Sequence, residues 1–469
     1  MAKDGNNAVS HKGHLHLERV QRVIKNKLST VHFIGIGGVS MSSLARLTMK
    51  LGCTVTGSDR CAFSMLGELT ALGARIVIGH ATELVESATL VVYSHAIADY
   101  DPELVRAREL EITTISRADY LGALMLDYTN RIGVSGTHGK STTTAMLDKI
   151  FTVANASPTV ISGASLSDGS PLRIGDMSTL IYEACEYKDS FLSFSPTVAI
   201  ATNLELDHTD YFKDISELRE SFRCALSHAS DYAVVNYDDV NLAKILPSIK
   251  ARTVTFGTRK GADYRYSITA FLDRGYEFDI SRYGTTIASF NLNIPGTYNV
   301  ANAVSAIVCA LEFGIDLDTV KEAISSFSGI ERRLEYVGRH RMRQVYYDYA
   351  HHPTAIASVI NTVRMITRGE VTVVFKPHTY SRTASLWEEF KSALSLADKI
   401  ILTDIYPARE EPMPNISSER MARELGDRAV YLSDAEVVYG LDNYSRGAVI
   451  IMGAGDMSEI KDAILKNPI

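Results

Sequence analysis

The chain of 469 residues has little of what marks secreted or membrane-bound proteins. Its five cysteines are far apart, odd in number and without the paired spacing of a metal site, which argues against a disulfide framework and favours reduced thiols. No apolar run approaches the roughly 18 to 20 residues that a membrane helix needs, and the first residues lack the apolar stretch of a signal peptide. We therefore expect a soluble, cytoplasmic protein.

Long blocks of one charge sign are also absent. The formal net charge of -7 is spread along the chain, so the composition does not favour nucleic acid as a partner, although local basic residues can still bind small anions. No repeat period or low-complexity tract is visible. The length predicts about three domains, each large enough to bury its own core, and leaves open whether the protein is a monomer or a dimer.

Short β-branched runs alternate with helical stretches, a pattern typical of parallel, doubly wound sheets. We predict an α/β protein with a Rossmann-like N-terminal domain (1–126), a central P-loop ATPase-type domain with a mainly parallel sheet (127–331) and a C-terminal Rossmann-like domain (332–469). Residues 1–29 are polar; we expect the first dozen to be disordered and one helix over 17–28. The expected strands include 30–36, 54–57, 75–78, 90–94, 343–347, 371–375, 400–403 and 448–452.

A glycine-bracketed turn follows the apolar strand that begins the central domain. Gly136 and Gly139 allow backbone N–H groups to face phosphate oxygens, Lys140 can reach the terminal phosphates of ATP, and Ser141 offers a hydroxyl to Mg²⁺. The turn therefore predicts an ATP site. The residues that we assign to ATP here are Gly136, Thr137, His138, Gly139, Lys140, Ser141 and Thr142.

This loop departs from the usual motif at one position. The first glycine normally stands five residues before the Gly-Lys pair, where this chain has Val134, so we expect a shorter loop. A helix should begin behind it near Met146. The alternative is an ordinary strand-to-helix turn that contains Gly-Lys-Ser by coincidence.

A second glycine-rich turn follows the first strand. Gly35, Gly37 and Gly38 lie where a helix N-terminus would face a pyrophosphate, and Asp59 ends the next strand, where a carboxylate can accept hydrogen bonds from a ribose. The dinucleotide fingerprint has its third glycine where this chain has Ser40. A nucleotide diphosphate other than NAD is therefore at least as well suited as a redox cofactor, and a turn without a ligand is the alternative.

Two strands of the central domain end in polar side chains. Because ligands in α/β sheets bind at the carboxyl ends of strands, we expect Glu183 and His208 to come to the phosphate loop. Their O and N ligands suit a second hard cation, in addition to the Mg²⁺ at Ser141. We expect Glu186, Glu205 and Asp207 to be supporting or structural.

Two amides lie three residues apart at the start of a predicted helix. Asn299 and Asn302 would share one helical face, and their donors and acceptors suit an adenine edge. An N-cap role for Asn299 is the alternative.

Titratable groups gather after two strands of the last domain, which we expect to be neighbours. Asp348 can bind a ribose or an amine, His351 and His378 can hydrogen-bond a reacting carboxylate, and Arg382 suits bidentate carboxylate recognition. A third strand end, residues 402–410, would wall this acceptor site, and residues 453–456 would close it.

Taken together, these segments resemble the Mur ligase family. The similarity runs from about Val31 to the end of the chain and rests on seven motifs in order. They are His-Phe-Ile-Gly-Ile-Gly-Gly at 32, Gly-Thr-His-Gly-Lys-Ser at 136, Glu-Ala-Cys-Glu at 183, Thr-Asn-Leu-Glu-Leu-Asp-His at 202, Tyr-Asn-Val-Ala-Asn-Ala at 298, Arg-Arg-Leu at 332 and Asp-Tyr-Ala-His-His-Pro-Thr at 348.

The resemblance implies an enzyme with a UDP-sugar domain, a central ATPase domain and a C-terminal domain that helps bind ATP and the amino acid. The implied reaction joins L-alanine to the carboxylate of UDP-N-acetylmuramate through an acyl phosphate, in peptidoglycan synthesis. It would use ATP and two Mg²⁺ ions, with Mn²⁺ as a possible substitute.

The resemblance also implies roles for single residues. Lys140 and Ser141 would hold phosphates and Mg²⁺, Glu183 and His208 the second metal, Asn299 and Asn302 adenine, Arg333 the γ-phosphate, and Asp348 the ribose. Catalysis would rest on Lys140, Glu183, His208, Arg333 and His351, and acceptor binding on His351, His378 and Arg382. The UDP sugar would lie against Gly35, Gly37, Gly38, Ser40, Asp59 and Ser94.

Three alternatives stay open. One is a recycling ligase that attaches a whole murein peptide to the same UDP sugar. Another is a nucleotide-binding dehydrogenase, which rests on Gly35 to Gly38 alone. The third is a non-catalytic, nucleotide-gated binding protein, against which Lys140, Glu183 and His208 weigh.

Overall fold

The computed structural model describes residues 17–166, 168–208, 211–272, 274–408, 410–441 and 446–466, so the disorder expected for the first dozen residues lies outside the described part. The chain forms two compact units. Unit 1 runs to Glu205 and includes Ser216–Phe256 and Val308–Ile315; unit 2 consists of Leu206–Ile215, Gly257–Ile307 and Asp316 onward. Among the described helices, none combines the length and the apolar content needed to cross a bilayer.

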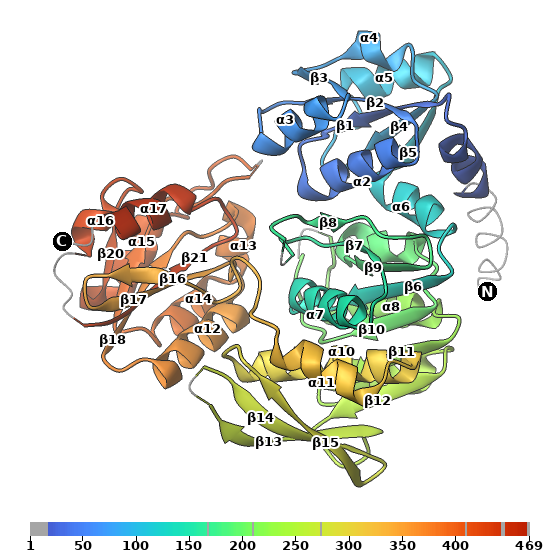
Figure 1. Ribbon diagram of the computed structural model, residues 1–469. Helices are drawn as coiled ribbons and strands as arrows, with labels where there is room; N and C mark the ends of the chain where they lie inside the picture. The colour runs from blue at the N-terminus through green and yellow to red at the C-terminus, as the bar shows by residue number, and fades with distance from the viewer. Residues whose placement is uncertain are drawn as a thin grey trace, which may run out of the picture. The chain divides into compact units, whose positions relative to one another are not determined.

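The first sheet is wholly parallel, as predicted, with the strand order β3-β2-β1-β4-β5 (Figure 1). Its strands are β1 (Thr30–Ile34), β2 (Thr54–Asp59), β3 (Arg75–Ile78), β4 (Leu90–Tyr93) and β5 (Thr113–Ser116). Strand β1 ends two residues before the predicted end, because Gly35 leaves the strand with a φ of +80°. The helix before it covers residues 17–25 of the predicted 17–28.

Strand β1 lies at the centre of this sheet, between β2 and β4. Because the chain winds outward from β1 in both directions, the ends of these three strands form the switch point at which doubly wound sheets bind ligands. Helix α2 (Val39–Lys50) begins directly after the glycine turn. The predicted sugar-nucleotide residues therefore lie at the ligand-binding edge of the sheet.

The central sheet of unit 1 carries the phosphate loop. Within this unit the strand order is β12-β11-β10-β6-β9-β7-β8, and all neighbours are parallel except β7 and β8. The strands are β6 (Asn130–Ser135), β7 (Thr159–Ile161), β8 (Leu172–Arg173), β9 (Thr179–Glu183), β10 (Val198–Ala201), β11 (Tyr232–Asn236) and β12 (Thr253–Gly257). Strand β6 is thus flanked by the two strands whose polar ends were predicted to meet the loop.

The helix behind the phosphate loop, α7 (Lys140–Val153), begins six residues earlier than the predicted Met146. Gly139 has a φ of +85° and ends the loop, so the threonines after Ser141 are already helical. Threonine is a weak helix former, but here the run is buried against the sheet and tertiary packing overrides its propensity.

Unit 2 contains an antiparallel trio of strands and a second, mostly parallel sheet. The trio is β13 (Tyr264–Phe271), β14 (Tyr276–Arg282) and β15 (Thr285–Leu292). The sheet has the order β16-β17-β21-β18-β19-β20, and only β16 is antiparallel to its neighbour. Its strands are β16 (Glu335–His340), β17 (Arg343–Asp348), β18 (Glu370–Phe375), β19 (Lys399–Leu402), β20 (Ala429–Tyr431) and β21 (Gly447–Met452).

The predicted adjacency of β17 and β18 is wrong, because β21 lies between them. This strand comes from near the end of the chain, so chain order does not reveal its position. The three strands nevertheless end at one level, since Asp348 and Phe375 both pair with Met452. The polar residues that follow β17 and β18 therefore still meet at one edge.

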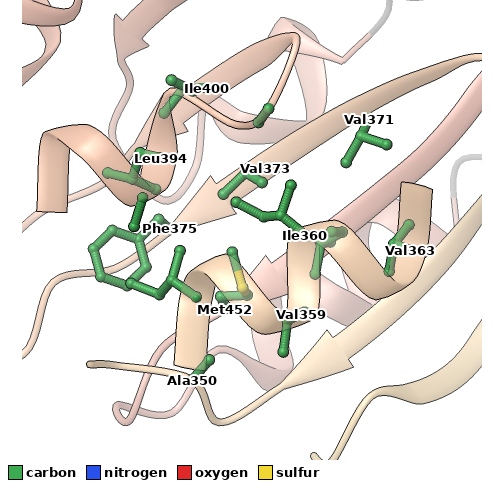
Figure 2. Packing of buried hydrophobic residues seen from close by; sticks show 14 of the residues in the cluster. Ala350, Val359, Ile360, Val363, Val371, Val373, Phe375, Leu394, Ile400 and Met452 are labelled. Atoms are coloured by element: carbon green, nitrogen blue, oxygen red, sulfur yellow. The ribbon is translucent and has the colours of Figure 1, made fainter. Parts of the chain in front are cut away.

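Strand β18 is buried on both faces, which explains its continuous apolar sequence. On one face Val371, Val373 and Phe375 pack with Ile360 of helix α12 (Pro353–Ile366), as Figure 2 shows. On the other face Val374 belongs to a separate buried cluster. The strand is thereby fixed in register, and so is the loop that follows it.

We predict that Ile360→Ala destabilises the C-terminal sheet by about 2–5 kcal/mol, because it removes a fully buried side chain from this cluster. Met365→Ala on the same helix is the control: Met365 is 59% exposed, and its loss should change stability by less than about 0.5 kcal/mol. Urea unfolding followed by circular dichroism measures both, and equal effects of the two substitutions would contradict the packing described.

Candidate functional site

The phosphate loop is held in shape by the segment that follows β10. A Cβ atom on Gly136 would lie 2.0 Å from Oγ1 of Thr202, so only glycine fits there. The side chain of Asn203 binds both backbone groups of His138: its Oδ1 accepts from the amide N at 2.8 Å and its Nδ2 donates to the carbonyl at 2.9 Å. Thr137 is held similarly, since its hydroxyl donates to the backbone carbonyl of Glu205 at 3.0 Å. The loop is thus preorganised.

The loop lysine, itself half-buried, forms an ion pair with a buried carboxylate. The Nζ atom of Lys140 lies 3.0 Å from Oε2 of Glu186, a residue only 2% exposed. Burial opposes the charged form of Lys140, but the Glu186 carboxylate outweighs it and raises the pKa of the ammonium group. Lys140 therefore stays positively charged beside the glycine turn. Helix α7 has no side-chain cap at its N-terminus, where backbone N–H groups favour anions.

Glu183 ends β9 beside the loop strand, as predicted, and pairs in register with Val134. Its Oε1 atom accepts a hydrogen bond from Oγ of Ser162 at 3.0 Å and another from the backbone N of Gly163. His208 belongs to unit 2, where its backbone N donates to Oδ1 of Asp207 at 2.7 Å. Glu183 is part of unit 1, so their shared metal site stays a prediction.

The predicted sugar-nucleotide residues gather where β2, β1 and β4 end. Ile34 pairs with Ser58 and with Tyr93, so Gly35, Asp59 and Ser94 follow the three strands at the same level. The Oδ2 atom of Asp59 accepts a hydrogen bond from the backbone N of Gly37 at 2.8 Å. In this structure the carboxylate therefore shapes the glycine turn; ribose binding by Asp59 stays a prediction.

The two amides predicted for adenine lie in the first turns of helix α10 (Thr297–Phe313), and both are buried. Asn299 donates to the carbonyl of Pro295 at 2.6 Å, and Asn302 donates to Oδ1 of Asn299 at 3.3 Å. Asn299 lies inside the helix, so the alternative of an N-cap is wrong. Pairing of the amides along one face agrees with the predicted spacing.

Asp348 fixes the start of the C-terminal sheet. Its two carboxylate oxygens accept backbone hydrogen bonds from Leu334 and Ala350, each 2.6 Å long. Burial raises the pKa of Asp348, and Arg333 opposes that effect. Arg333 also lies over the ring of Tyr349, 5.0 Å from its centroid. The residues predicted for ribose and γ-phosphate therefore lie near each other within unit 2, while their nucleotide contacts stay a prediction.

The three predicted acceptor residues come together in unit 2. The Nη1 atom of Arg382 lies 3.0 Å from Nδ1 of His378, and the ring centroids of His378 and His351 are 6.0 Å apart. The second guanidinium nitrogen, Nη2, lies 3.2 Å from Oδ1 of Asp207. Tyr406 stacks on His378 with 5.5 Å between ring centroids, so the third strand end walls this cluster as predicted.

Both imidazoles of this acceptor cluster are neutral at physiological pH. Burial and then the Arg382 charge lower the pKa of His351 to about 3 and that of His378 to about 4. The guanidinium can only donate, so Nδ1 of His378 accepts. Nδ1 of His351 lies 3.0 Å from the carbonyl oxygen of Tyr349, which can only accept, so this nitrogen carries the proton and Nε2 holds the lone pair.

Two residues expected to be supporting or structural pair with functional cations. Glu186 pairs with Lys140, and Asp207 pairs with Arg382, so both support a predicted site residue. Burial opposes ionisation of Asp207, but His208 and Arg382 outweigh it and hold its pKa well below the usual range. In the sequence, both residues stand in polar motifs at strand ends, and this position marks them as candidates. The motif alone does not tell which cation each carboxylate contacts.

We predict that unit 2 loses stability as the pH falls from about 6.5 toward 4. The pKa of His378 is about 4 in the folded chain against an ordinary 6.5, so the unfolded chain binds more protons in this window. The loss attributable to this side chain between pH 7 and pH 5 should be about 1–2 kcal/mol.

His378→Gln keeps an acceptor for Arg382 and should flatten this pH dependence. His80→Gln, whose parent side chain in unit 1 is 46% exposed, is the control. Urea unfolding at the two pH values compares the three proteins. The prediction is wrong if the His378→Gln variant shows the same acid-induced loss as the unaltered protein.

Comparison with known proteins covers nearly the whole described chain. Residues 30–129 match the model for the Mur ligase family catalytic domain, residues 134–310 the Mur ligase middle domain, and residues 332–456 the Mur ligase glutamate ligase domain. These three matches correspond to the three sheets described above.

Curated relatives agree. The chain is similar to the UDP-N-acetylmuramate–L-alanine ligase of Caldicellulosiruptor bescii, with 39% identity over 93% of this chain and 98% of that protein, and to the protein of the same name from Acetivibrio thermocellus, with 39% identity over 96% and 98%. The crystal structure of UDP-N-acetylmuramate-alanine ligase from Thermotoga maritima superimposes with a TM-score of 0.79 at 27% identity, over 93% and 98% of the two chains. A murein peptide ligase from Psychrobacter arcticus shares the fold, with a TM-score of 0.70 at 21% identity over 94% and 98%. The chain belongs to the Mur ligase family.

Proposed function

We propose that this protein catalyses the ATP-dependent ligation of L-alanine to the carboxylate of UDP-N-acetylmuramate, a step of peptidoglycan synthesis. The observation that carries the proposal is the near full-length similarity to curated UDP-N-acetylmuramate–L-alanine ligases at 39% identity. The geometry supports it independently, since the glycine turn, the phosphate loop and the acceptor cluster each provide donors suited to an anionic group of one substrate.

ATP binds with its phosphates on the loop between β6 and α7. Backbone N–H groups at the N-terminus of α7 face the phosphates, and Lys140 neutralises the terminal ones. Glu186 keeps the lysine protonated and directed toward the loop before ATP arrives. Asn299 and Asn302 contact adenine, Asp348 the ribose and Arg333 the γ-phosphate.

Divalent cations complete the phosphate site. Ser141, Glu183 and His208 offer a hydroxyl, a carboxylate and an imidazole, a donor set that fits Mg²⁺ or Mn²⁺. Both hydrogen bonds of Glu183 go to its Oε1 atom, and within the described part of the chain Oε2 accepts none. The Oε2 atom can therefore serve as the metal ligand. Two bound Mg²⁺ ions would neutralise the charge of the transferring phosphoryl group.

The reaction begins when a carboxylate oxygen of the muramoyl group attacks the γ-phosphorus of ATP. The bond to the β,γ-bridging oxygen breaks, giving ADP and an acyl phosphate. A carboxylate is a poor electrophile, but phosphorylation turns one of its oxygens into part of a phosphate leaving group. The chain's role in this step is to place cations beside both anions and to exclude water that would hydrolyse the product.

The acceptor is the amine of L-alanine. Its nitrogen attacks the acyl carbon, a tetrahedral intermediate forms, and expulsion of phosphate leaves the amide. Arg382 binds the amino acid's carboxylate through guanidinium donors not directed at Asp207 and His378. The neutral imidazole of His351 presents a lone pair on Nε2 and can accept a hydrogen bond from the amino group, which orients it toward the acyl carbon; with a pKa of about 3 the imidazole is too weak a base to keep the proton, which leaves with the phosphate or to water.

The close rival is a recycling ligase that attaches a murein peptide to the same sugar, because such an enzyme shares the fold. A dehydrogenase is a weaker rival, since Ser40 replaces the third glycine of the dinucleotide fingerprint. The first is distinguished by the acceptor that drives turnover and the second by binding of NAD.

We predict that the protein releases phosphate from ATP in the presence of Mg²⁺, UDP-N-acetylmuramate and L-alanine, and that L-alanine is preferred over glycine, L-serine and murein tripeptide. A coupled phosphate assay measures each acceptor. Release with tripeptide and none with L-alanine would transfer the proposal to peptide recycling. If none of the four acceptors drives phosphate release, the ligase reaction is excluded. Binding of NAD, measured by calorimetry, would support the dehydrogenase.

We also predict that Lys140→Ala lowers turnover at least about a hundredfold, because it removes the half-buried cation of the phosphate loop. Affinity for UDP-N-acetylmuramate, measured by calorimetry, should stay within about twofold, since the sugar nucleotide binds the first sheet. Lys149→Ala on the same helix is the matched control and should keep its activity. Loss of sugar binding in a folded Lys140 variant would contradict the separation of the two nucleotide sites.

A further inference from the structure

Arg117 is a cation placed where its helix does not favour one. It is the first residue of helix α6 (Arg117–Met125), and positive charge at a helix N-terminus opposes the helix dipole. Burial also lowers the pKa of its guanidinium. The Nη1 atom donates to the hydroxyl of Ser40 at 3.0 Å. This neutral acceptor does not compensate the charge.

Lys188 is a second cation with a neutral acceptor. It lies on a 3-10 helix, η1 (Tyr187–Ser193), and its Nζ atom donates to the carbonyl of His95 at 3.1 Å. Lys188 and Asp189 both have left-handed backbone conformations, with φ of +51° and +55°. A hydrogen bond between Asp189 and Ser221 holds the second of them. Such strain persists where surrounding structure enforces it and is commonest at functional sites.

The two cations share one neighbourhood in unit 1. Burial, then Lys188, then Arg117 lower the pKa of His95, so both charges lie close to this imidazole. The nearby carboxylate of Asp119 accepts hydrogen bonds from Ser116 and Ser193 instead. Within the described residues, neither Arg117 nor Lys188 forms an ion pair with a carboxylate.

Arg117 contacts the segment after the glycine turn, and Lys188 lies close in the chain to the residue that pairs with the phosphate-loop lysine. Ser40, the partner of Arg117, is in the first turn of α2, two residues after Gly38. Lys188 follows two residues after Glu186, the partner of Lys140.

We propose that Arg117 and Lys188 are positioning residues that bind the muramoyl carboxylate of the sugar nucleotide and direct it toward the γ-phosphate of ATP. The proposal rests on the proposed function. The diphosphate of the sugar nucleotide faces the N–H groups of the glycine turn, so the group that must extend toward Lys140 is the carboxylate. Its attack brings two anions together, and cations beside the carboxylate reduce their repulsion. A guanidinium also matches a carboxylate in shape.

The test compares two nucleotides by calorimetry. UDP-N-acetylmuramate carries the carboxylate, whereas UDP-N-acetylglucosamine has the same diphosphate and lacks it. In Lys188→Gln and Arg117→Gln, affinity for the first should fall about tenfold or more, and affinity for the second should change by less than about twofold. Arg117→Lys should recover part of the loss. The exposed Lys244→Gln is the control and should change neither, and the KM for ATP should be unchanged in all variants.

The outcomes separate this inference from the proposed function. Equal loss of affinity for both nucleotides would assign the cations to the diphosphate and overturn the carboxylate role, and so would unchanged affinity for UDP-N-acetylmuramate in folded variants. In either case the unaltered protein would still release phosphate with L-alanine, and the proposed function would stand. No phosphate release by the unaltered protein would overturn the proposed function and the inference together.

Discussion

The ion pair between the half-buried Lys140 and the buried Glu186 is the interaction on which the phosphate site depends. An ammonium group partly removed from water is costly unless a carboxylate compensates it, and the same partial burial strengthens the effect of its charge on a phosphate. The pair requires that β9 lie beside β6, because the loop after β9 brings Glu186 and the loop after β6 brings Lys140. It also requires a loop with one shape, which Asn203 secures by binding both backbone groups of His138. Sheet order, loop conformation and lysine charge are therefore one coupled arrangement.

Unit 2 uses a related device with the opposite effect on protonation. Arg382 is compensated by Asp207, and its charge together with burial keeps His351 and His378 neutral. A cation thus suppresses a second positive charge on the imidazoles and preserves their lone pairs. In the phosphate loop a carboxylate preserves a cation, and in the acceptor cluster a cation preserves two bases. Both results follow from the same rule that burial magnifies the influence of the nearest charge.

Much of this arrangement could be predicted from sequence, because it depends on local patterns. Apolar strands, glycine turns and polar strand ends identify the α/β fold, the phosphate loop and the strand-end clusters.

The predictions that were wrong have physical causes. The helix after Gly139 begins earlier than its threonines suggest, because burial compensates their low propensity. Strand β21 separates β17 from β18, and no local signal reports a pairing made by a distant segment. Glu186 and Asp207 were expected to be supporting or structural, but the cation that each contacts could not be predicted, because side-chain direction in three dimensions sets the partner. The domain boundaries stay a prediction.

The charge of the whole chain makes this local organisation necessary. With a net charge of -7, the long-range field of the protein opposes nucleotides that are themselves anionic. Salt screens that field within about 8–10 Å, so binding must come from groups in direct contact with the ligand. Helix N-termini and cations with partial or no compensation supply such contacts, and they occur at the strand ends of the first sheet, the central sheet and the C-terminal sheet. Each expected anion then meets its own cation: Arg117 and Lys188 near the first turn, Lys140 on the loop and Arg382 in the acceptor cluster. Separate local cations allow an overall acidic chain to bind two anionic nucleotides and the carboxylate of an amino acid.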